Sequence, residues 1–319
     1  TIDLATGAAR LVGKIGGSEA IRDLTVAPPA PLQSGFYAIT AGNNLIWFSG
    51  ANPNLTRGMI AISGLQTGET ILGIDLRPAT GQLYALGSTS RLYRLSPLTG
   101  AATIVGSGPF SPTLSGTAFG FDFNPVVDRI RVVSNTGQNL RLHPVTGVVA
   151  GVDTPLAPGG SQAVAAAYTN NFSGTTTTTL FVIDAATDSL QLQGGVNGAP
   201  SPNGGLLSPV WPLGVDITGD VGFDIQLDEA GLQAASVDAL FAPGEMAFAA
   251  LTPAGATSSR LYVIDLLNGA AKLVGRIGGT EIVHSLVSDV GFVEQPTGEE
   301  ETEEPTALIN QIYLPLINR

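Results

Sequence analysis

A short apolar pattern recurs along the chain and limits the folds that it can adopt. Residues 72–78 read LGIDLRP, residues 119–125 read FGFDFNP, and residues 213–217 read LGVDI. The step from Asp75 to Asp122 is 47 residues, and the step from Asp122 to Asp216 is 94, twice as long. A period in the forties is the length of a four-stranded propeller blade. The sequence therefore predicts a β-propeller.

Shorter strands separated by glycine turns fill each repeat. The first copy is followed by strand patterns at residues 82–86, 91–96 and 102–106, and the second by patterns at 129–133, 139–143 and 148–151. We predict an all-β propeller of six four-stranded blades over residues 21–292, with a seventh blade as the alternative. Residues 194–212 are rich in Gly, Pro, Asn and Ser and predict a rim loop. Six inner strands are expected, beginning near Thr25, Asp75, Asp122, Ala167, Asp216 and Ala250.

The composition is that of an acidic protein with few charges. Charged residues make up 13% of the 319 residues, and the net charge is -12. Nucleic-acid-binding proteins need a basic surface, so this class is disfavoured. The absence of Cys excludes disulfides and zinc–thiolate sites. No apolar run of about 18 residues predicts a transmembrane helix, and a start at Thr1 without Met fits a processed, exported product.

The two ends of the chain repeat each other. Residues 1–26 align with residues 263–288 without a gap, at a constant offset of 262, and 14 of the 26 positions are identical. We expect residues 21–26 to form the inner strand of the blade that contains residues 36–40, 45–48 and 59–62. Residues 284–292 are then a second copy with no blade of their own, and residues 1–20 are a surplus outer hairpin.

These surplus elements complement each other, and three outcomes stay open. They can meet in one molecule as a seventh blade, or meet between molecules in a head-to-tail chain that need not close. They can also be the remains of a tandem ancestor. Residues 293–306 predict an acidic linker, and residues 307–319 an apolar tail strand suited to pairing with an exposed sheet edge. The side chains expected to mediate assembly are Ile2, Leu4, Leu11, Val12, Leu286, Val290, Phe292, Ile312, Tyr313, Leu314, Leu316 and Ile317.

Side chains that carry chemistry are few. The two histidines, His143 and His284, have no partner motif for acid–base work. Asp75, Asp122 and Asp216 occupy equivalent repeat positions and could ring a channel and bind a cation, but we expect each to cap a turn through its own backbone. The sequence thus predicts no catalytic residue, no cofactor and no metal ligand. Asn54 and Asn171 match the glycosylation acceptor pattern.

Four stretches resemble a bacterial secreted family catalogued as domain of unknown function 4394. They are GETILGIDLRPATGQLYALGSTSRLYRLSPLTGAAT (68–103), GTAFGFDFNPVVDRIRVVSNTGQNLRLHPVTG (116–147), AAAYTNNF (165–172) and RLYVIDLLNGAAKLVGRIGG (260–279). The resemblance covers about residues 36–292. It implies an exported, propeller-like repeat domain, and it implies no reaction, so no catalytic residue carries over.

We therefore expect a non-enzymatic structural protein, secreted and located outside the cell or on its surface. It would build filaments or a surface layer from copies of itself by exchanging terminal strands. The alternative is a closed monomeric propeller that binds a cell-surface glycan or an ion. An enzyme such as a lyase or hydrolase would instead require clustered carboxylates with shifted pKa values near a pocket.

Overall fold

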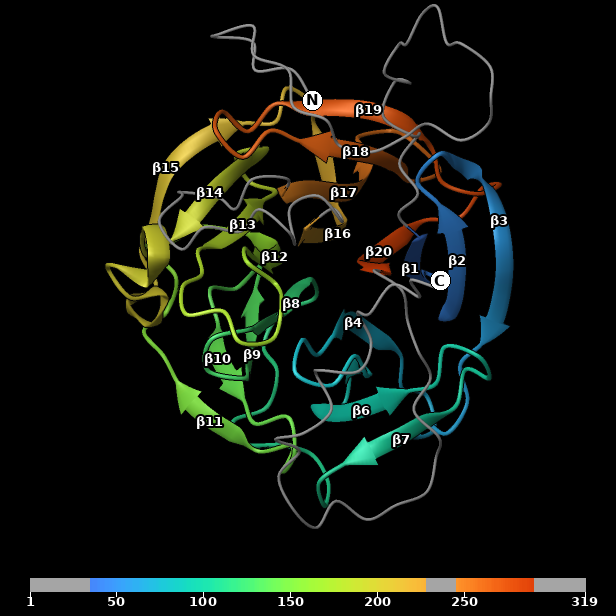
Figure 1. Ribbon diagram of the computed structural model, residues 1–319, viewed down its shortest axis with the longest axis horizontal. Helices are drawn as coiled ribbons and strands as arrows, with labels where there is room; N and C mark the ends of the chain where they lie inside the picture. Colours follow the sequence, from blue (N-terminus) through green and yellow to red (C-terminus); the bar gives the residue numbers. More distant parts are fainter. Residues whose placement is uncertain (1–34, 228–244, 290–319) are drawn as a thin grey trace, which may run out of the picture.

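The computed structural model describes residues 35–227 and 245–289, which form a ring of five four-stranded antiparallel sheets (Figure 1). Viewed down the shortest axis, the sheets lie around a centre as the blades of a propeller. Blade 1 is β20-β1-β2-β3, and blades 2 to 5 are β4–β7, β8–β11, β12–β15 and β16–β19. The strands are β1 (Gly35–Thr40), β2 (Asn44–Ser49), β3 (Asn52–Ala61), β4 (Ile71–Leu76), β5 (Leu83–Gly87), β6 (Arg91–Leu95), β7 (Ala102–Val105), β8 (Phe119–Asn124), β9 (Arg129–Ser134), β10 (Asn139–Leu142), β11 (Val149–Val152), β12 (Ala163–Tyr168), β13 (Leu180–Asp184), β14 (Ser189–Gln193), β15 (Leu207–Pro212), β16 (Ile217–Leu227), β17 (Glu245–Pro253), β18 (Arg260–Ile264), β19 (Ala271–Arg276) and β20 (Val283–Asp289).

The ring is closed by the C-terminal strand of the described chain. β20 pairs antiparallel with β1, with Ala38 opposite Leu286, and so supplies the inner strand of blade 1. The expectation that residues 284–292 have no blade is therefore wrong for the described part of that segment. The place predicted for residues 21–26 is taken by their C-terminal copy, and residues 1–34 lie outside the described residues.

The prediction of six or seven blades is wrong, because the described residues form five. Thr25 lies outside them, and Ala250 belongs to β17, the second strand of blade 5, where it pairs with Gly222 of β16. β17 resembles an inner strand in sequence because residues 247–252 are buried on both faces. A strand buried on both faces reads as a continuous apolar run, whatever its position in the blade.

Each pair of neighbouring blades shares an apolar core, which is how radial repetition removes exposed sheet faces. Phe121 of blade 3 packs with Leu86 of blade 2, and Ala249 of blade 5 with Ile183 of blade 4. Phe36 of blade 1 meets Phe248 of blade 5 edge-on, with ring centroids 4.9 Å apart. A further apolar core joins blade 1 to blade 2, so blade 1 packs against both of its neighbours and the ring is continuous.

Most of the remaining strands lie close to where the sequence predicts them. Residues 207–212, expected in a rim loop, form the outermost strand of blade 4, where Pro209 and Pro212 are tolerated because one side of an edge strand has no partner. The loop that precedes β15 contains two short 3-10 turns, η1 (Val196–Gly198) and η2 (Pro202–Gly204). This loop reaches blade 3, where Asn203 accepts a hydrogen bond from the backbone of Thr154.

Candidate functional site

Three aspartates from three blades meet where the inner strands of the ring converge. Asp75 lies on β4, Asp122 on β8 and Asp224 on β16, and a carboxylate oxygen of each lies within 4.8 Å of the others. All three residues are at most 2% exposed. We call this group the carboxylate cluster.

The cluster joins neighbouring blades through backbone hydrogen bonds. Asp75 accepts from the Phe123 amide of the next blade at 2.7 Å, and Asp122 accepts from the Tyr168 amide at 3.0 Å. Asp224 accepts from the backbone of Ser288 at 2.7 Å and from its hydroxyl. Asp75 and Asp224 each also accept a hydrogen bond from the amide of the following residue, but both lie inside strands, so the expected capping of a turn does not occur at Asp75. The bonds between blades were not anticipated.

A glycine two positions before each aspartate permits this close approach. A Cβ at Gly73 would lie 2.6 Å from Phe121, one at Gly120 2.7 Å from the backbone of Ala165, and one at Gly222 2.4 Å from the Leu286 amide. Any side chain at these positions would push the inner strands apart. The hydrogen bonds between blades would then be lost.

Burial and mutual repulsion disfavour the charged form of the cluster. Burial, followed by the charge of Asp224, raises the pKa of Asp75 well above its usual range, and burial with the charges of both partners does the same for Asp122. Burial raises the pKa of Asp224 despite its hydrogen bonds from Ser288. Chemically, such a group holds protons or a cation, for which carboxylate oxygens are suitable ligands.

One predicted member of this ring is wrong. Asp216 is exposed and precedes β16, whereas Asp224 occupies the inner position. The sequence does hold the signal, because residues 221–224 read VGFD and match FGFD at residues 119–122. Asp216, in the nearby LGVD at 213–216, lies twice 47 residues from Asp122, and this spacing points to the wrong aspartate. The loop before β15 lengthens blade 4 and breaks that spacing.

A polar pocket of about 350 Å³ opens between blades 3 and 4, and we call it the arginine pocket. Blade 3 contributes Asn124 and three arginines, and blade 4 contributes the end of β12 and the loop around η2. None of these residues was singled out from the sequence. The lining residues are Asn124, Val127, Arg129, Arg131, Arg141, Tyr168, Ser201, Pro202 and Asn203.

A buried ionic network forms the floor of this pocket. Arg131 and Arg141 lie opposite each other on β9 and β10, and both bind Asp153. Arg131 donates to Asp153 at 2.6 Å, to Asn139 at 2.6 Å and to Asn203 at 2.7 Å, while Arg141 binds both carboxylate oxygens of Asp153 at 2.8 Å. The side chains of Arg131 and Asp153 are only 2% and 5% exposed.

The carboxylate and the guanidinium groups of this network favour their ionised forms. Burial alone would raise the pKa of Asp153, but hydrogen bonds from Arg141 and Arg131 outweigh it and hold that pKa below its usual value. The bond to Asp153 raises the pKa of Arg141 further. Since a guanidinium is not deprotonated in proteins, the pocket has a fixed positive charge.

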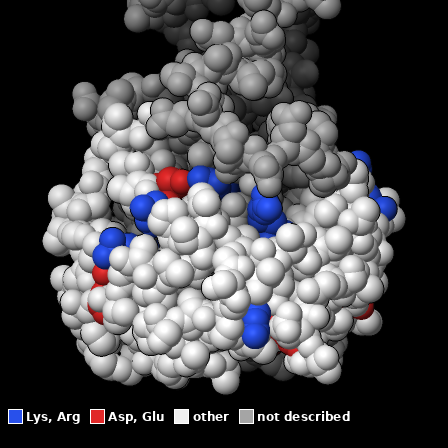
Figure 2. All heavy atoms as spheres, turned by 90° about the horizontal axis from the view of Figure 1, so that it is seen from below, with Lys and Arg blue, Asp and Glu red and all other residues white. Residues whose placement is uncertain are grey.

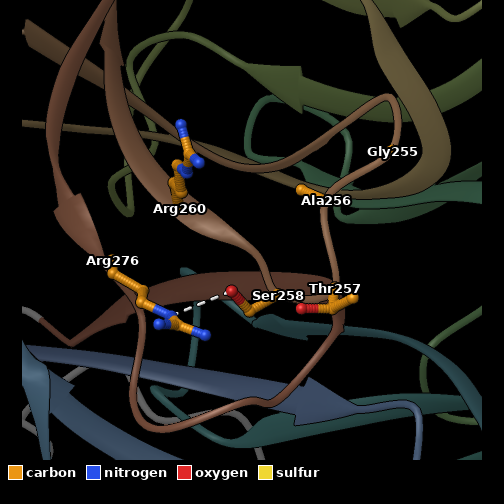
Figure 3. A pocket seen from close by; sticks show the side chains of 6 residues that line it. All are labelled: Gly255, Ala256, Thr257, Ser258, Arg260 and Arg276. Atoms are coloured by element: carbon orange, nitrogen blue, oxygen red, sulfur yellow. Dashed lines mark hydrogen bonds between the residues drawn. The ribbon is translucent and has the colours of Figure 1, made fainter.

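A second pocket, of about 280 Å³, lies on blade 5 (Figure 3). The loop at residues 255–258 borders it, with Arg260 from β18 and Arg276 from β19. Arg276 donates to the Ser258 hydroxyl at 2.9 Å, and Arg260 is exposed and points away from Arg276. On the face drawn in Figure 2, charged side chains of both signs are few and lie among uncharged residues.

Comparison with known families shows to which family the chain belongs. A family model described as domain of unknown function (DUF4394) matches residues 44–287. The chain belongs to this family. No curated protein matches this DUF4394 domain.

The DUF4394 domain is also similar to solved structures, at low identity. A protein from Lactobacillus plantarum is 17% identical with a TM-score of 0.37, and the match covers 79% of this chain and 70% of that one. The Dos1 propeller is 14% identical with a TM-score of 0.37, over 76% and 57%. Dihydro-heme d1 dehydrogenase NirN is 11% identical with a TM-score of 0.35, over 78% and 45%, so this domain spans less than half of that chain. No property of these proteins transfers at such scores.

The histidines of the DUF4394 domain have structural partners. The ring nitrogen Nδ1 of His143 accepts from the amides of Val145 and Thr146 at 3.2 and 3.4 Å, which closes a turn. His284, on β20, donates from Nε2 to the Ile71 carbonyl at 2.8 Å. Burial lowers the pKa of both rings, so both favour the neutral form.

The other predicted sites are scattered. Asn54 is exposed on β3, whereas Asn171 is half-buried and follows β12. Leu286 is buried in β20, inside blade 1. The remaining side chains expected to mediate assembly lie outside the described residues. No helix among the described residues is long and apolar enough to span a membrane.

Proposed function

We propose that this DUF4394 domain is a non-enzymatic binding module that takes a small ligand into the arginine pocket, in an extracellular or cell-surface setting. The observation that carries the proposal is the pocket itself, a polar cavity of about 350 Å³ whose floor is a buried ionic network. Ligand pockets begin at about 300 Å³ and rely on a few fixed polar groups for specificity. Because Arg131 and Asp153 are held on several sides, the polar groups are in place before a ligand arrives.

Binding is supported over catalysis by the way the reactive side chains are used. Each histidine bonds to the backbone, and the three carboxylates of the cluster bond to amides of neighbouring blades. None of the three aspartates lines either pocket. General acid–base work needs a group within reach of a substrate. The carboxylate cluster therefore supports the ring, and the arginine pocket is the better candidate for contact with a ligand.

The test blocks the pocket without touching its floor. Val127 lines the pocket and is 53% exposed, whereas its neighbour Val126 is 40% exposed and is not part of the lining. The Val127→Trp variant should fill the mouth, and Val126→Trp is the matched control. A library of neutral and acidic mono- and disaccharides is screened by shifts in melting temperature. A hit that Val127→Trp removes and Val126→Trp retains supports the proposal, and a library without hits, or hits unaffected by Val127→Trp, contradicts it.

A second candidate function is self-assembly, and a specific observation favours it. β20 fills the closing position of the ring, and residues 21–27 carry the sequence that aligns with it at the offset of 262. Leu24 aligns with Leu286, and Asp23 aligns with Ser285, whose hydroxyl accepts from the Ile74 amide at 2.8 Å. An Asp could accept the same bond. Each chain thus has two sequences for one position, and exchange between chains would link rings head to tail.

Electron microscopy distinguishes this candidate from a closed monomer. Negative-stain images of the full chain over a range of concentrations should show strings of rings, and deletion of residues 1–27 should leave single rings. Single rings at every concentration would contradict self-assembly, and strings that survive the deletion would contradict this mechanism for it.

A further inference from the structure

We infer that the arginine pocket recognises an oxyanion, a carboxylate or sulfate group carried by a small ligand of sugar size. The inference rests on the proposed function and specifies the chemistry of the ligand.

Each side-chain acceptor of the wall already accepts at least one hydrogen bond from the protein. The Tyr168 hydroxyl oxygen accepts from Nε of Arg131 at 3.3 Å, and the Asn203 amide oxygen accepts from the same guanidinium. The Asn124 amide oxygen accepts from the amides of residues 126 and 127, and the Ser201 hydroxyl oxygen accepts from the Asn203 amide at 3.3 Å. Asp153 has both oxygens engaged by guanidinium groups.

The donors of the same wall are largely free. Arg129 uses only Nη1, which donates to two backbone carbonyls, and Arg141 uses Nε and Nη2 on Asp153. Within the described part of the chain, the Tyr168 hydroxyl proton and the side-chain amide protons of Asn124 and Asn203 meet no acceptor. Tyr168 is 1% exposed, and a buried donor without a partner carries a free-energy cost. A ligand that complements this wall must therefore supply acceptors.

Charge leads to the same conclusion. Arg129, Arg131 and Arg141 carry three positive charges at the pocket, against the single carboxylate of Asp153. The protein as a whole has a net charge of -12, so the pocket is a local exception to the overall charge. Guanidinium groups match the planar, two-oxygen face of a carboxylate or sulfate, and such charge-assisted bonds are about twice as strong as neutral ones.

The two pockets differ in how deeply their arginines are buried. Arg260 and Arg276 also bring two guanidiniums to one hollow, but both are exposed, and Arg276 contacts a single hydroxyl. Exposed arginines lose much of their attraction to an anion through solvent screening. In the arginine pocket the buried pair of Arg131 and Asp153 holds Tyr168 and Asn203 in place. The difference in burial is why we assign the oxyanion to the pocket between blades 3 and 4.

The experiment is calorimetric titration of the full chain at low ionic strength with D-glucuronate, D-glucose, sulfate and phosphate. D-glucuronate should bind at one site, at least about tenfold more tightly than the neutral D-glucose, because bonds to charged groups are the stronger ones. Arg129→Met and Tyr168→Phe remove donors without removing the ionic floor, and each should weaken D-glucuronate about tenfold. Arg260→Met, in the second pocket, is the control and should change nothing.

The outcomes separate this inference from the proposed function. Sulfate or phosphate that binds like D-glucuronate supports recognition of the oxyanion itself, with the sugar ring adding little. D-glucose that binds as tightly as D-glucuronate, and loses affinity in Tyr168→Phe, overturns the oxyanion and keeps the binding pocket. Binding that Arg260→Met abolishes, or that neither pocket variant weakens, overturns the inference. If in addition no compound of the saccharide library binds, the proposed function fails as well.

Discussion

The carboxylate cluster and the network beneath the arginine pocket are two buried groups of ionisable side chains. They differ in whether an opposite charge compensates the buried carboxylates. In the network, Asp153 lies between two guanidiniums, and its pKa is held down. In the cluster, Asp75, Asp122 and Asp224 face one another with only backbone amides and Ser288 as donors, and their pKa values are raised. One group is compensated by opposite charge, and the other is not.

Of the two groups, the network can present a fixed charge to a ligand. A compensated pair remains ionised over the whole physiological range, so the pocket above it keeps its field. An uncompensated cluster changes its charge with pH, and its oxygens are committed to holding inner strands together. Buried ionisable groups without an opposite charge favour their neutral form. Such a group can hold the inner strands together, but it does not offer a fixed charge to a ligand.

The largest effect is expected from removing the charge of Asp153. Asp153→Asn leaves the buried guanidinium of Arg131 without its counterion, and breaking a buried pair in this way costs about 3–5 kcal/mol. Chemical denaturation at pH 7 measures the loss in free energy of unfolding.

The matched control for Asp153→Asn is Asp128→Asn. Asp128 binds Arg77 at 2.6 Å, but its side chain is 35% exposed, and partly exposed pairs contribute about 1 kcal/mol or less. Asn also tolerates the positive φ of 49° at this position. Equal losses in the two variants would mean that Asp153 is not the buried counterion that the structure describes.

A smaller effect, of opposite direction, is expected in the carboxylate cluster. Asp122→Asn keeps an oxygen for the Tyr168 amide and removes one charge from three, so it should raise the free energy of unfolding at pH 8. A raised pKa in the folded state means that wild-type stability from this group is full below about pH 4 and declines as the pH rises toward the folded pKa. The gain should therefore shrink as the pH falls to 4, and a variant that is less stable than wild type at pH 8 would contradict this.

The pH dependence of Asp153 should have the opposite sign. Its pKa is lowered, so its contribution is present above the unfolded value of about 3.9 and is lost as the pH falls through the folded pKa. Thermal unfolding of wild type and Asp153→Asn between pH 2 and pH 6 should converge at the acid end. Curves that stay parallel would show that the loss in Asp153→Asn does not come from the charge.

The smallest effect on stability is expected from Tyr168→Phe. The variant removes one hydroxyl whose bond with Arg131 is 3.3 Å long, so the cost should be about 1 kcal/mol or less. Loss of ligand binding with so small a change in melting temperature would separate recognition from folding at the pocket. A loss of several kcal/mol would place Tyr168 within the supporting network instead.

Much of the propeller could be predicted because the repeat is encoded locally. Turns with glycine and strands such as residues 82–86 and 129–133 lie close to where the sequence predicts them. The number of blades was harder to predict than the strands, because β17 is as apolar as an inner strand. Closure was also missed, because residues 21–26 and β20 share one sequence pattern, and pattern alone cannot choose between two copies.

The sites were harder to predict than the fold. The repeat predicts Asp75 and Asp122 correctly. It predicts Asp216 as the third member, whereas the structure has Asp224, eight residues later. The arginine pocket combines residues from two blades and a loop, which no local spacing reveals. Arg131 and Arg141 left no signal either, because charged residues such as Arg94 and Asp122 lie in other strands too.

We infer that the ionic network of Arg131, Arg141 and Asp153 prepares the pocket above it for an anion. A crystal structure of the full chain soaked with D-glucuronate tests this most directly. The sugar carboxylate should lie between blades 3 and 4 and accept hydrogen bonds from the Tyr168 hydroxyl and from Arg129 or Arg141. A carboxylate bound instead beside Arg260 and Arg276, or an empty arginine pocket at saturating D-glucuronate, would contradict it.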